Sequence, residues 1–266
     1  MASAAVAVPA SIEARSGAQC AVPETGLGQP ELLSRATNLL DNGQDININI
    51  VMHFCCSAGE KCPRDEIAQA EIELMNSFVS SARITFSLEA VKHIDNTKCK
   101  SDINRWDDML DLITDVRQGD ASTLNIVYVQ GNRGDGTKGV CSQPRLGARL
   151  SDQALAMDGC VVAMDTLPEG NDGKDPVYPA ITIHEAGHWL SLDHTVGDNG
   201  NVMTSNLLEK TEYSFNEVQL KQMRQKAVER LEQSNLVESD EPPAPRPSKP
   251  APAAVPGDAW VWMHKK

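Results

Sequence analysis

The chain of 266 residues is long enough for one substantial domain of about 200 residues with additional tails. Its 24 basic and 37 acidic residues give a net charge of −13, which argues against a nucleic-acid-binding surface, because such a surface needs clustered Lys and Arg. No apolar run approaches the roughly 18 residues that a membrane-spanning helix requires, so we expect neither a nucleic-acid nor a membrane partner.

The N-terminal stretch, residues 1–42, is punctuated by Gly, Pro, Ala and Ser and holds one short helical pattern near residues 31–40. We predict a poorly structured leader or pro-region with little core of its own. Residues 4–10 are mildly apolar, but no basic residue precedes them, and they reach only the lower limit of the roughly 7–15 residues of a signal-peptide core. No convincing signal peptide is therefore visible.

Residues 43–236 alternate between β-branched runs and helix-spaced apolar residues, which predicts one α/β (α+β) domain. Strands are expected at 46–54, 84–91, 124–129 and 160–164. Helices are expected from Pro63 through residue 78, at 106–116, at 180–190 and at 216–233. The apolar positions of the first, second and last of these helices are Ile67, Ile72, Leu74, Met75 and Phe78; Met109, Leu110, Leu112 and Ile113; and Val218, Met223, Val228 and Leu231.

Two loops are rich in glycine and polar residues. The stretch 131–139 contains four glycines and is predicted to be a loop without regular structure. Together with residues 197–201 it offers oxygen ligands that calcium could use, but no EF-hand spacing is present. Ordinary loops are favoured over a calcium site.

The C-terminal stretch, residues 237–266, is predicted to be a disordered tail. Seven prolines fall between residues 241 and 256, which is typical of a solvated polyproline-type segment. Trp260 and Trp262 follow, and a docking motif and a frayed terminus both remain open for them.

Seven cysteines, more than a cytosolic protein of this size usually carries, favour a few disulfides in an oxidising compartment with one thiol left over. A set of buried, reduced cysteines is the alternative. A bond between the neighbours Cys55 and Cys56 is disfavoured because it would be strained, and the absence of a CxxC pair argues against a structural zinc knuckle.

A metal-binding pattern lies in the helix expected at 180–190. His184 and His188 are four residues apart, so both imidazoles point to one side and can reach a tetrahedral zinc at about 2.1 Å. Glu185 misses the metal but can reach a water beside it and take its proton. His194 can join only if the helix ends near Leu190 and the chain turns back, since a continued helix would carry it roughly 15 Å away. A surface helix with incidental histidines is the alternative.

The histidine pattern, with Met203 in the Gly/Asn-rich turn that follows, resembles the HExxHxxGxxH signature and methionine turn of the metzincin metalloproteases. More narrowly, the chain resembles the pappalysin-like branch and its fungal secreted members over about residues 45–230. The stretches that carry this resemblance are INIVMHF, ITFSLEAV, LNIVYV, DGCVVAMDTLPEG, HEAGHWLSLDHT, NVMTSN and FNEVQLKQMR.

The resemblance implies a metzincin-like catalytic domain over 43–236, with a mixed twisted sheet, an active-site helix, a methionine turn and a C-terminal helix. It implies zinc (Zn²⁺) bound by His184, His188 and His194, with Glu185 as the general base of a metalloendopeptidase. It also implies an extended peptide or protein substrate on an edge strand, which we expected near residues 160–164. Secretion to the extracellular space and a monomeric state complete the expectation.

The chain departs from the family pattern at three points. Ser191 stands where the family has a helix-breaking glycine, no aromatic residue follows Met203 closely, and the cysteines that often flank that turn are absent. These departures keep open a catalytically weak or inactive zinc-binding secreted effector of the same fold. A third alternative is an interaction module recruited through the proline-rich tail.

The remaining histidines receive a plainer interpretation. His53 lies in an expected strand and His93 follows one, so both are interpreted as core or surface residues and not as ligands. His264 is expected to be solvated.

Overall fold

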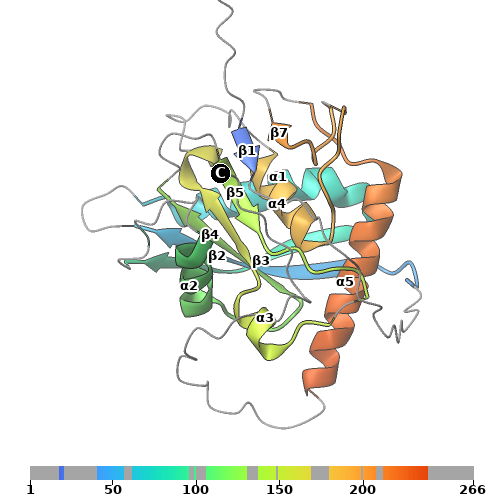
Figure 1. Ribbon diagram of the computed structural model, residues 1–266, viewed down its shortest axis with the longest axis horizontal. Helices are drawn as coiled ribbons and strands as arrows, with labels where there is room; N and C mark the ends of the chain where they lie inside the picture. Colours follow the sequence, from blue (N-terminus) through green and yellow to red (C-terminus); the bar gives the residue numbers. More distant parts are fainter. Residues whose placement is uncertain are drawn as a thin grey trace, which may run out of the picture.

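A mixed sheet forms the centre of the computed structural model, which describes residues 18–20, 41–56, 62–95, 99, 106–130, 137–147, 149–168, 180–198, 200–207 and 212–238. The strand order is β3-β2-β4-β6-β5-β1-β7 (Figure 1). The strands are β1 (Ala18–Cys20), β2 (Ile46–Cys55), β3 (Ile84–Ile94), β4 (Thr123–Val129), β5 (Thr137–Cys141), β6 (Cys160–Ala163) and β7 (Asn206–Leu207). The helical pattern expected at 31–40 and residues 239–266 lie outside the described residues.

Strand direction changes once within the main part of the sheet. Strands β3, β2, β4 and β6 are parallel, whereas β5 runs antiparallel to β6. Strand β1 then pairs parallel with β5, and β7 pairs antiparallel with β1. The mixed α/β class predicted from the sequence is confirmed.

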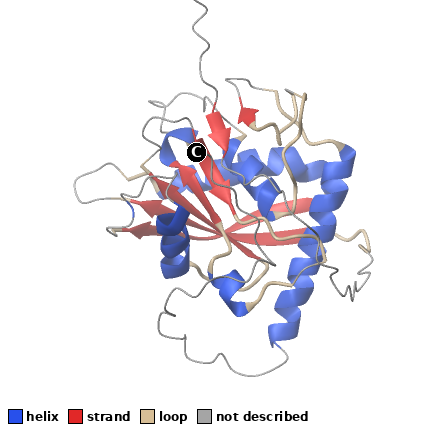
Figure 2. Cartoon of the chain, in the orientation of Figure 1, coloured by secondary structure: helices blue, strands red, loops and turns tan. Residues whose placement is uncertain are grey.

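Helices cover both faces of the sheet (Figure 2). They are α1 (Asp65–Val79), α2 (Trp106–Val116), α3 (Asp152–Ala156), α4 (Ile181–Trp189) and α5 (Glu217–Glu238), with short 3-10 turns at Ser80–Ala82 and Met164–Thr166. The side chains of β4 alternate between two cores: Ile126 and Tyr128 pack in the core that α1, α4 and α5 share, whereas Val127 and Val129 pack with α2. This alternation follows from the two-residue period of a strand.

Most of the predicted elements are present, and the structure corrects several details. Strand β5 begins inside the stretch 131–139, which was wrongly expected to lack regular structure, and β1, α3 and β7 were not predicted. Strand β6 lies between β4 and β5, so the expected edge strand near residues 160–164 is an interior strand. Val218 was expected to be an apolar core position of the last helix but is 73% exposed, because it lies on the outer side of the first turn of α5, whose Gln219 is the buried residue.

Three disulfides join six of the seven cysteines: Cys55–Cys99, Cys56–Cys62 and Cys141–Cys160. The expectation of a few disulfides is therefore confirmed, with the neighbours Cys55 and Cys56 bonded to different partners. Among the described helices, none combines the length and the apolar character that a membrane span requires.

Candidate metal centre

Helix α4 ends where the sequence pattern requires. Its last turn closes with the amide of Ser191 donating to the carbonyl of His188 at 2.8 Å and the amide of Leu192 donating to Gly187 at 2.9 Å. This pair of bonds is a Schellman motif, which needs a left-handed residue after the helix. Ser191 supplies it with φ of 71°. The chain therefore reverses direction directly after the helix.

The reversal brings the three predicted histidines together. The Nε2 atoms of His184 and His188 lie 3.0 Å apart, and each lies 3.3 Å from Nε2 of His194. A tetrahedral zinc with bonds of 2.0–2.1 Å would separate its nitrogen ligands by about 3.3 Å. The spacing of the three nitrogen atoms thus fits one zinc ion between them.

Backbone carbonyls fix the orientation of two imidazoles. Nδ1 of His184 lies 2.6 Å from the carbonyl of Val202, and Nδ1 of His188 lies 2.7 Å from that of Leu192. When each Nδ1 carries the proton and donates it, the Nε2 lone pair faces the centre, as in known metal sites. The tautomer is inferred from these contacts.

The environment keeps the imidazoles neutral, which is the state that binds a metal. Burial, with a smaller contribution from the neighbouring His194, lowers the pKa of His184 to about 3. Burial also lowers the pKa of His188 well below its ordinary value, with contributions from His184 and His194. The pKa of His194 is lowered by burial as well, although Asp193 opposes the effect.

Glu185 is fully buried next to His184 and lies against strand β5. A Cβ atom added to Gly139 would come within 2.6 Å of the carboxyl carbon of Glu185. The glycine therefore leaves the space in which this carboxyl group sits, and β5 is the strand that flanks it.

Met203 lies directly under the metal-binding helix. A Cβ on Gly187 would approach its sulfur within 2.6 Å, so the turn and the helix are in close contact. Asn201 stabilises this turn. Its side-chain oxygen accepts a hydrogen bond from the backbone amide of Met203 at 2.9 Å. The side-chain amides of Asn201 and Gln219 of α5 also form two hydrogen bonds with each other, of 2.9 and 3.0 Å.

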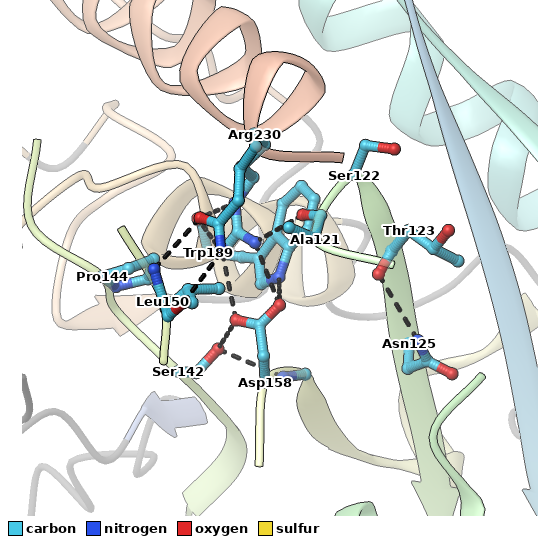
Figure 3. A network of polar contacts seen from close by, with 12 residues as sticks. Ala121, Ser122, Thr123, Asn125, Ser142, Pro144, Leu150, Asp158, Trp189 and Arg230 are labelled. Carbon is cyan, nitrogen blue, oxygen red and sulfur yellow. Dashed lines mark hydrogen bonds and ion pairs between the residues drawn. The ribbon is translucent and has the colours of Figure 1, made fainter. Parts of the chain in front are cut away.

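A buried ion pair ties α4 to α5 (Figure 3). Asp158 accepts the indole N–H of Trp189 at 2.9 Å, two guanidinium bonds from Arg230 at 3.0 and 3.1 Å, and the hydroxyl of Ser142 at 2.7 Å. Arg230 also stacks 3.4 Å above the Trp189 ring and donates to the Trp189 carbonyl. The C-terminal end of the metal-binding helix is thus anchored to two other elements.

Sequence reasoning missed the residues that support the centre. Gln143 donates to the carbonyl of Leu192 at 2.7 Å and to the carboxylate of Asp193 at 2.8 Å, and so holds the turn that leads to His194. Neither Gln143 nor Asp158 belongs to a recognisable motif. The sequence offers one hint: Asp158 is an acidic residue between two apolar segments, and a charge buried among apolar residues needs a partner.

The chain is similar to curated fungal proteins named extracellular metalloprotease. One from Arthroderma benhamiae is 30% identical over 171 residues, which cover 62% of this chain and 58% of that protein. One from Pyricularia oryzae is 28% identical over 138 residues, covering 51% of this chain and 46% of the relative. The chain therefore matches about half the length of these relatives, and no family model matches it.

Among solved structures, the chain is similar to Tannerella forsythia mature mirolysin in complex with a cleaved peptide. The TM-score is 0.50 with 15% sequence identity, over 73% of this chain and 98% of that one. At this identity the likeness concerns the fold. In sequence the chain is thus similar to fungal proteins named extracellular metalloprotease, and in fold it is similar to mirolysin, in agreement with the sequence resemblance.

Proposed function

We propose that the chain is a zinc-dependent endopeptidase in which His184, His188 and His194 hold the metal and Glu185 is the general base. The observation that carries the proposal is the spacing of the three Nε2 atoms, 3.0–3.3 Å, which matches the ligand separation around one tetrahedral zinc. The relatives named extracellular metalloprotease support the same activity.

The protein's own groups divide the chemistry between them. A bound zinc supplies Lewis acidity, which polarises a carbonyl and makes water more acidic. Glu185, buried beside this point, takes the proton of the attacking water and passes it to the leaving amine of the cleaved peptide. The carbonyls of Val202 and Leu192 hold His184 and His188 in the orientation that keeps their Nε2 atoms toward the centre.

We further propose that a protein or peptide substrate adds to the side of β5 that faces away from β6, because Gly139 of this strand contacts Glu185. In the structure, β1 occupies that side: Gln19 is in register with Thr137 and Cys20 with Gly139. This pairing supports the interpretation of residues 1–42 as a pro-region whose strand competes with substrate. Removing this N-terminal segment should raise the peptidase activity.

Secretion is part of the proposal. The relatives are named extracellular, and three disulfides among the described residues suit an oxidising compartment.

The decisive test is hydrolysis of denatured casein by the purified chain beside Glu185→Gln, with the zinc content of both proteins measured. The substitution keeps the size of the side chain and removes the base. We expect one zinc per chain in both proteins and a fall in kcat of at least about a hundredfold in the variant.

Each other outcome points to a different function. Stoichiometric zinc without activity in both proteins would favour the inactive zinc-binding effector. Absence of zinc from protein made without chelators would overturn the metal site and favour an interaction module. To test the pro-region, a site-specific cleavage sequence placed within residues 21–40 allows one preparation to be assayed before and after its N-terminal segment is cut.

A further inference from the structure

A second group of metal-binding side chains lies apart from the three-histidine centre. Within the described part of the chain, only Cys56, Cys62 and His93 form another such cluster, with one ligand atom from each within 4.8 Å of the others. Cys56 follows β2, Cys62 precedes α1, and His93 lies near the end of β3. Three elements of the fold therefore meet at this corner.

The imidazole of His93 is oriented as a metal ligand would be. Its Nδ1 lies 2.7 Å from Sγ of Cys62, and its other nitrogen, Nε2, lies 2.7 Å from the carboxylate of Asp65. A carboxylate that accepts the far N–H of a histidine is the usual support of a metal-bound imidazole, because it fixes the tautomer and raises the basicity of the near nitrogen. The Cys62–His93–Asp65 arrangement thus presents the Nδ1 lone pair toward the cysteines.

The two cysteines are joined in the structure, so they can bind a metal only after reduction. Of the three disulfides, Cys56–Cys62 is the one that a reductant can reach, because it is the most exposed. Cys56 and Cys62 are half-buried, whereas Cys55–Cys99 and Cys141–Cys160 lie in the core, with every sulfur-bearing residue at most 5% exposed. Because a thiol must reach a disulfide sulfur to exchange with it, a reductant meets Cys56–Cys62 first.

We propose that reduction of the Cys56–Cys62 disulfide creates a second zinc site, made of the two thiolates and Nδ1 of His93. A dithiol, such as that of a thioredoxin-class protein, supplies two electrons and two protons: the Cys56–Cys62 bond breaks, two thiols form, and the dithiol becomes a disulfide. Zinc then displaces one proton from each thiol, while neutral His93 contributes a lone pair without losing a proton.

The metal replaces the cross-link that reduction removes. The disulfide joins two cysteines that are 6 positions apart, one after β2 and one before α1, and His93 adds β3 to the same point. A zinc ion bound by all three residues keeps these elements joined when the protein is reduced. This site is independent of the proposed peptidase activity, because it shares no residue with the His184–His188–His194 centre.

Cobalt distinguishes the two sites, since only thiolate ligation gives an intense near-ultraviolet thiolate-to-cobalt charge-transfer band. The full chain carrying Cys20→Ser, which removes the seventh cysteine of the sequence, is titrated with Co²⁺ before and after treatment with a water-soluble phosphine. We expect the band only after reduction, with one more metal bound per chain than before. Mass mapping of alkylated thiols should place the reduced pair at Cys56 and Cys62.

Two variants test the ligand set. His93→Ala should lower the cobalt affinity of the reduced protein more than about tenfold, and Asp65→Asn should lower it by about 10- to 100-fold. His184→Ala should leave the band unchanged, which separates this site from the peptidase centre. Circular dichroism of each variant confirms that it is folded. Absence of the band in the reduced protein, or a band of unchanged affinity in folded His93→Ala, would overturn the proposal.

Discussion

Gly139 leaves the space that the carboxyl group of Glu185 fills, since a Cβ on the glycine would lie 2.6 Å from the carboxyl carbon. This relationship ties the strand proposed to bind substrate to the residue proposed to act as base. It also explains a glycine in the middle of β5 (Thr137–Cys141), where a strand would ordinarily be weakened by it.

Gly139→Ala should displace Glu185 without touching the metal ligands. We expect kcat for casein to fall by about 10- to 100-fold, because a misplacement of about 1 Å costs this much, with zinc content unchanged. Gly200→Ala is the matched control, because the atom nearest to its added Cβ, a carboxylate oxygen of Asp198, would be 3.7 Å away. Equal activity of Gly139→Ala and the parent would show that Glu185 tolerates the shift.

Ser191 shows how the chain does without the family's glycine. The left-handed backbone, φ of 71°, costs a non-glycine residue about 1–2 kcal/mol. The Ser191 hydroxyl donates to the carbonyl of Pro144, and its own carbonyl accepts from Gln222 at 2.6 Å. The hydroxyl contact offsets part of the backbone cost.

A pair of substitutions separates these two effects. Ser191→Ala keeps the strained backbone and loses the hydroxyl bond, so unfolding free energy should fall by about 0.5–1.5 kcal/mol. Ser191→Gly loses the bond but relieves the backbone, so it should stay within about 1 kcal/mol of the parent. Denaturant melts of the three proteins provide the comparison. A glycine variant less stable than the alanine variant would contradict the argument.

Sequence reasoning succeeded where a local rule decides the structure. The bounds Trp106–Val116 follow from helical spacing of apolar residues, and the convergence of His184 and His188 follows from their four-residue separation. The return of His194 required only that the helix end near Leu190, which it does.

The missed features depend on contacts between distant segments. The sequence did not indicate strand β5, because Gly139 disfavours a strand. This glycine is explained only by Glu185, 46 positions further along, whose carboxyl group needs the space. The pairing of β1 with β5 joins Gln19 to Thr137, which no local pattern indicates. The interior position of β6 likewise depends on its pairing with β5. Because β5 was not predicted, β6 was wrongly expected to be the edge strand that binds substrate.

Glu71 makes stability depend on pH. It is buried in α1, and burial raises its pKa to about 7, while a hydrogen bond with Thr182 opposes the shift. A pKa higher in the folded than in the unfolded chain means that the folded state prefers the protonated form. Stability is therefore full below the unfolded pKa of about 4.5 and is lost as pH rises through 7.

Glu71→Gln should remove this dependence. Between pH 4.5 and 8, the parent should lose up to about 3 kcal/mol of unfolding free energy from this group, whereas the variant keeps it. Urea melts of both proteins at pH 5 and pH 8 measure the difference. An identical pH dependence in parent and variant would mean that Glu71 does not titrate in this window.

Asp158 has the opposite pH behaviour. Burial raises the pKa of its carboxyl group, but the charges of Arg230 and Arg117 and the hydrogen bonds from Arg230 and Ser142 together outweigh burial and place the pKa below the ordinary value of 3.8. A folded pKa below the unfolded one means that the contribution to stability is present above about pH 4 and is lost as the pH falls below it. The ion pair should therefore contribute fully at neutral pH.

Asp158→Asn leaves the buried guanidinium of Arg230 without its counter-charge, so unfolding free energy should fall by about 3–5 kcal/mol at pH 7. The double variant Asp158→Leu with Arg230→Met removes both charges and should cost less than the single one, because only Arg117, 3.8 Å from Asp158, then stays buried without its counter-charge. Since Arg230 also binds the carbonyl of Trp189, at the end of the metal-binding helix, zinc affinity should fall with stability in the single variant. Thermal melts and zinc titrations of both variants test this coupling. If the double variant proved the less stable of the two, the pair would be stabilising through its bonds to Trp189 more than through mutual neutralisation.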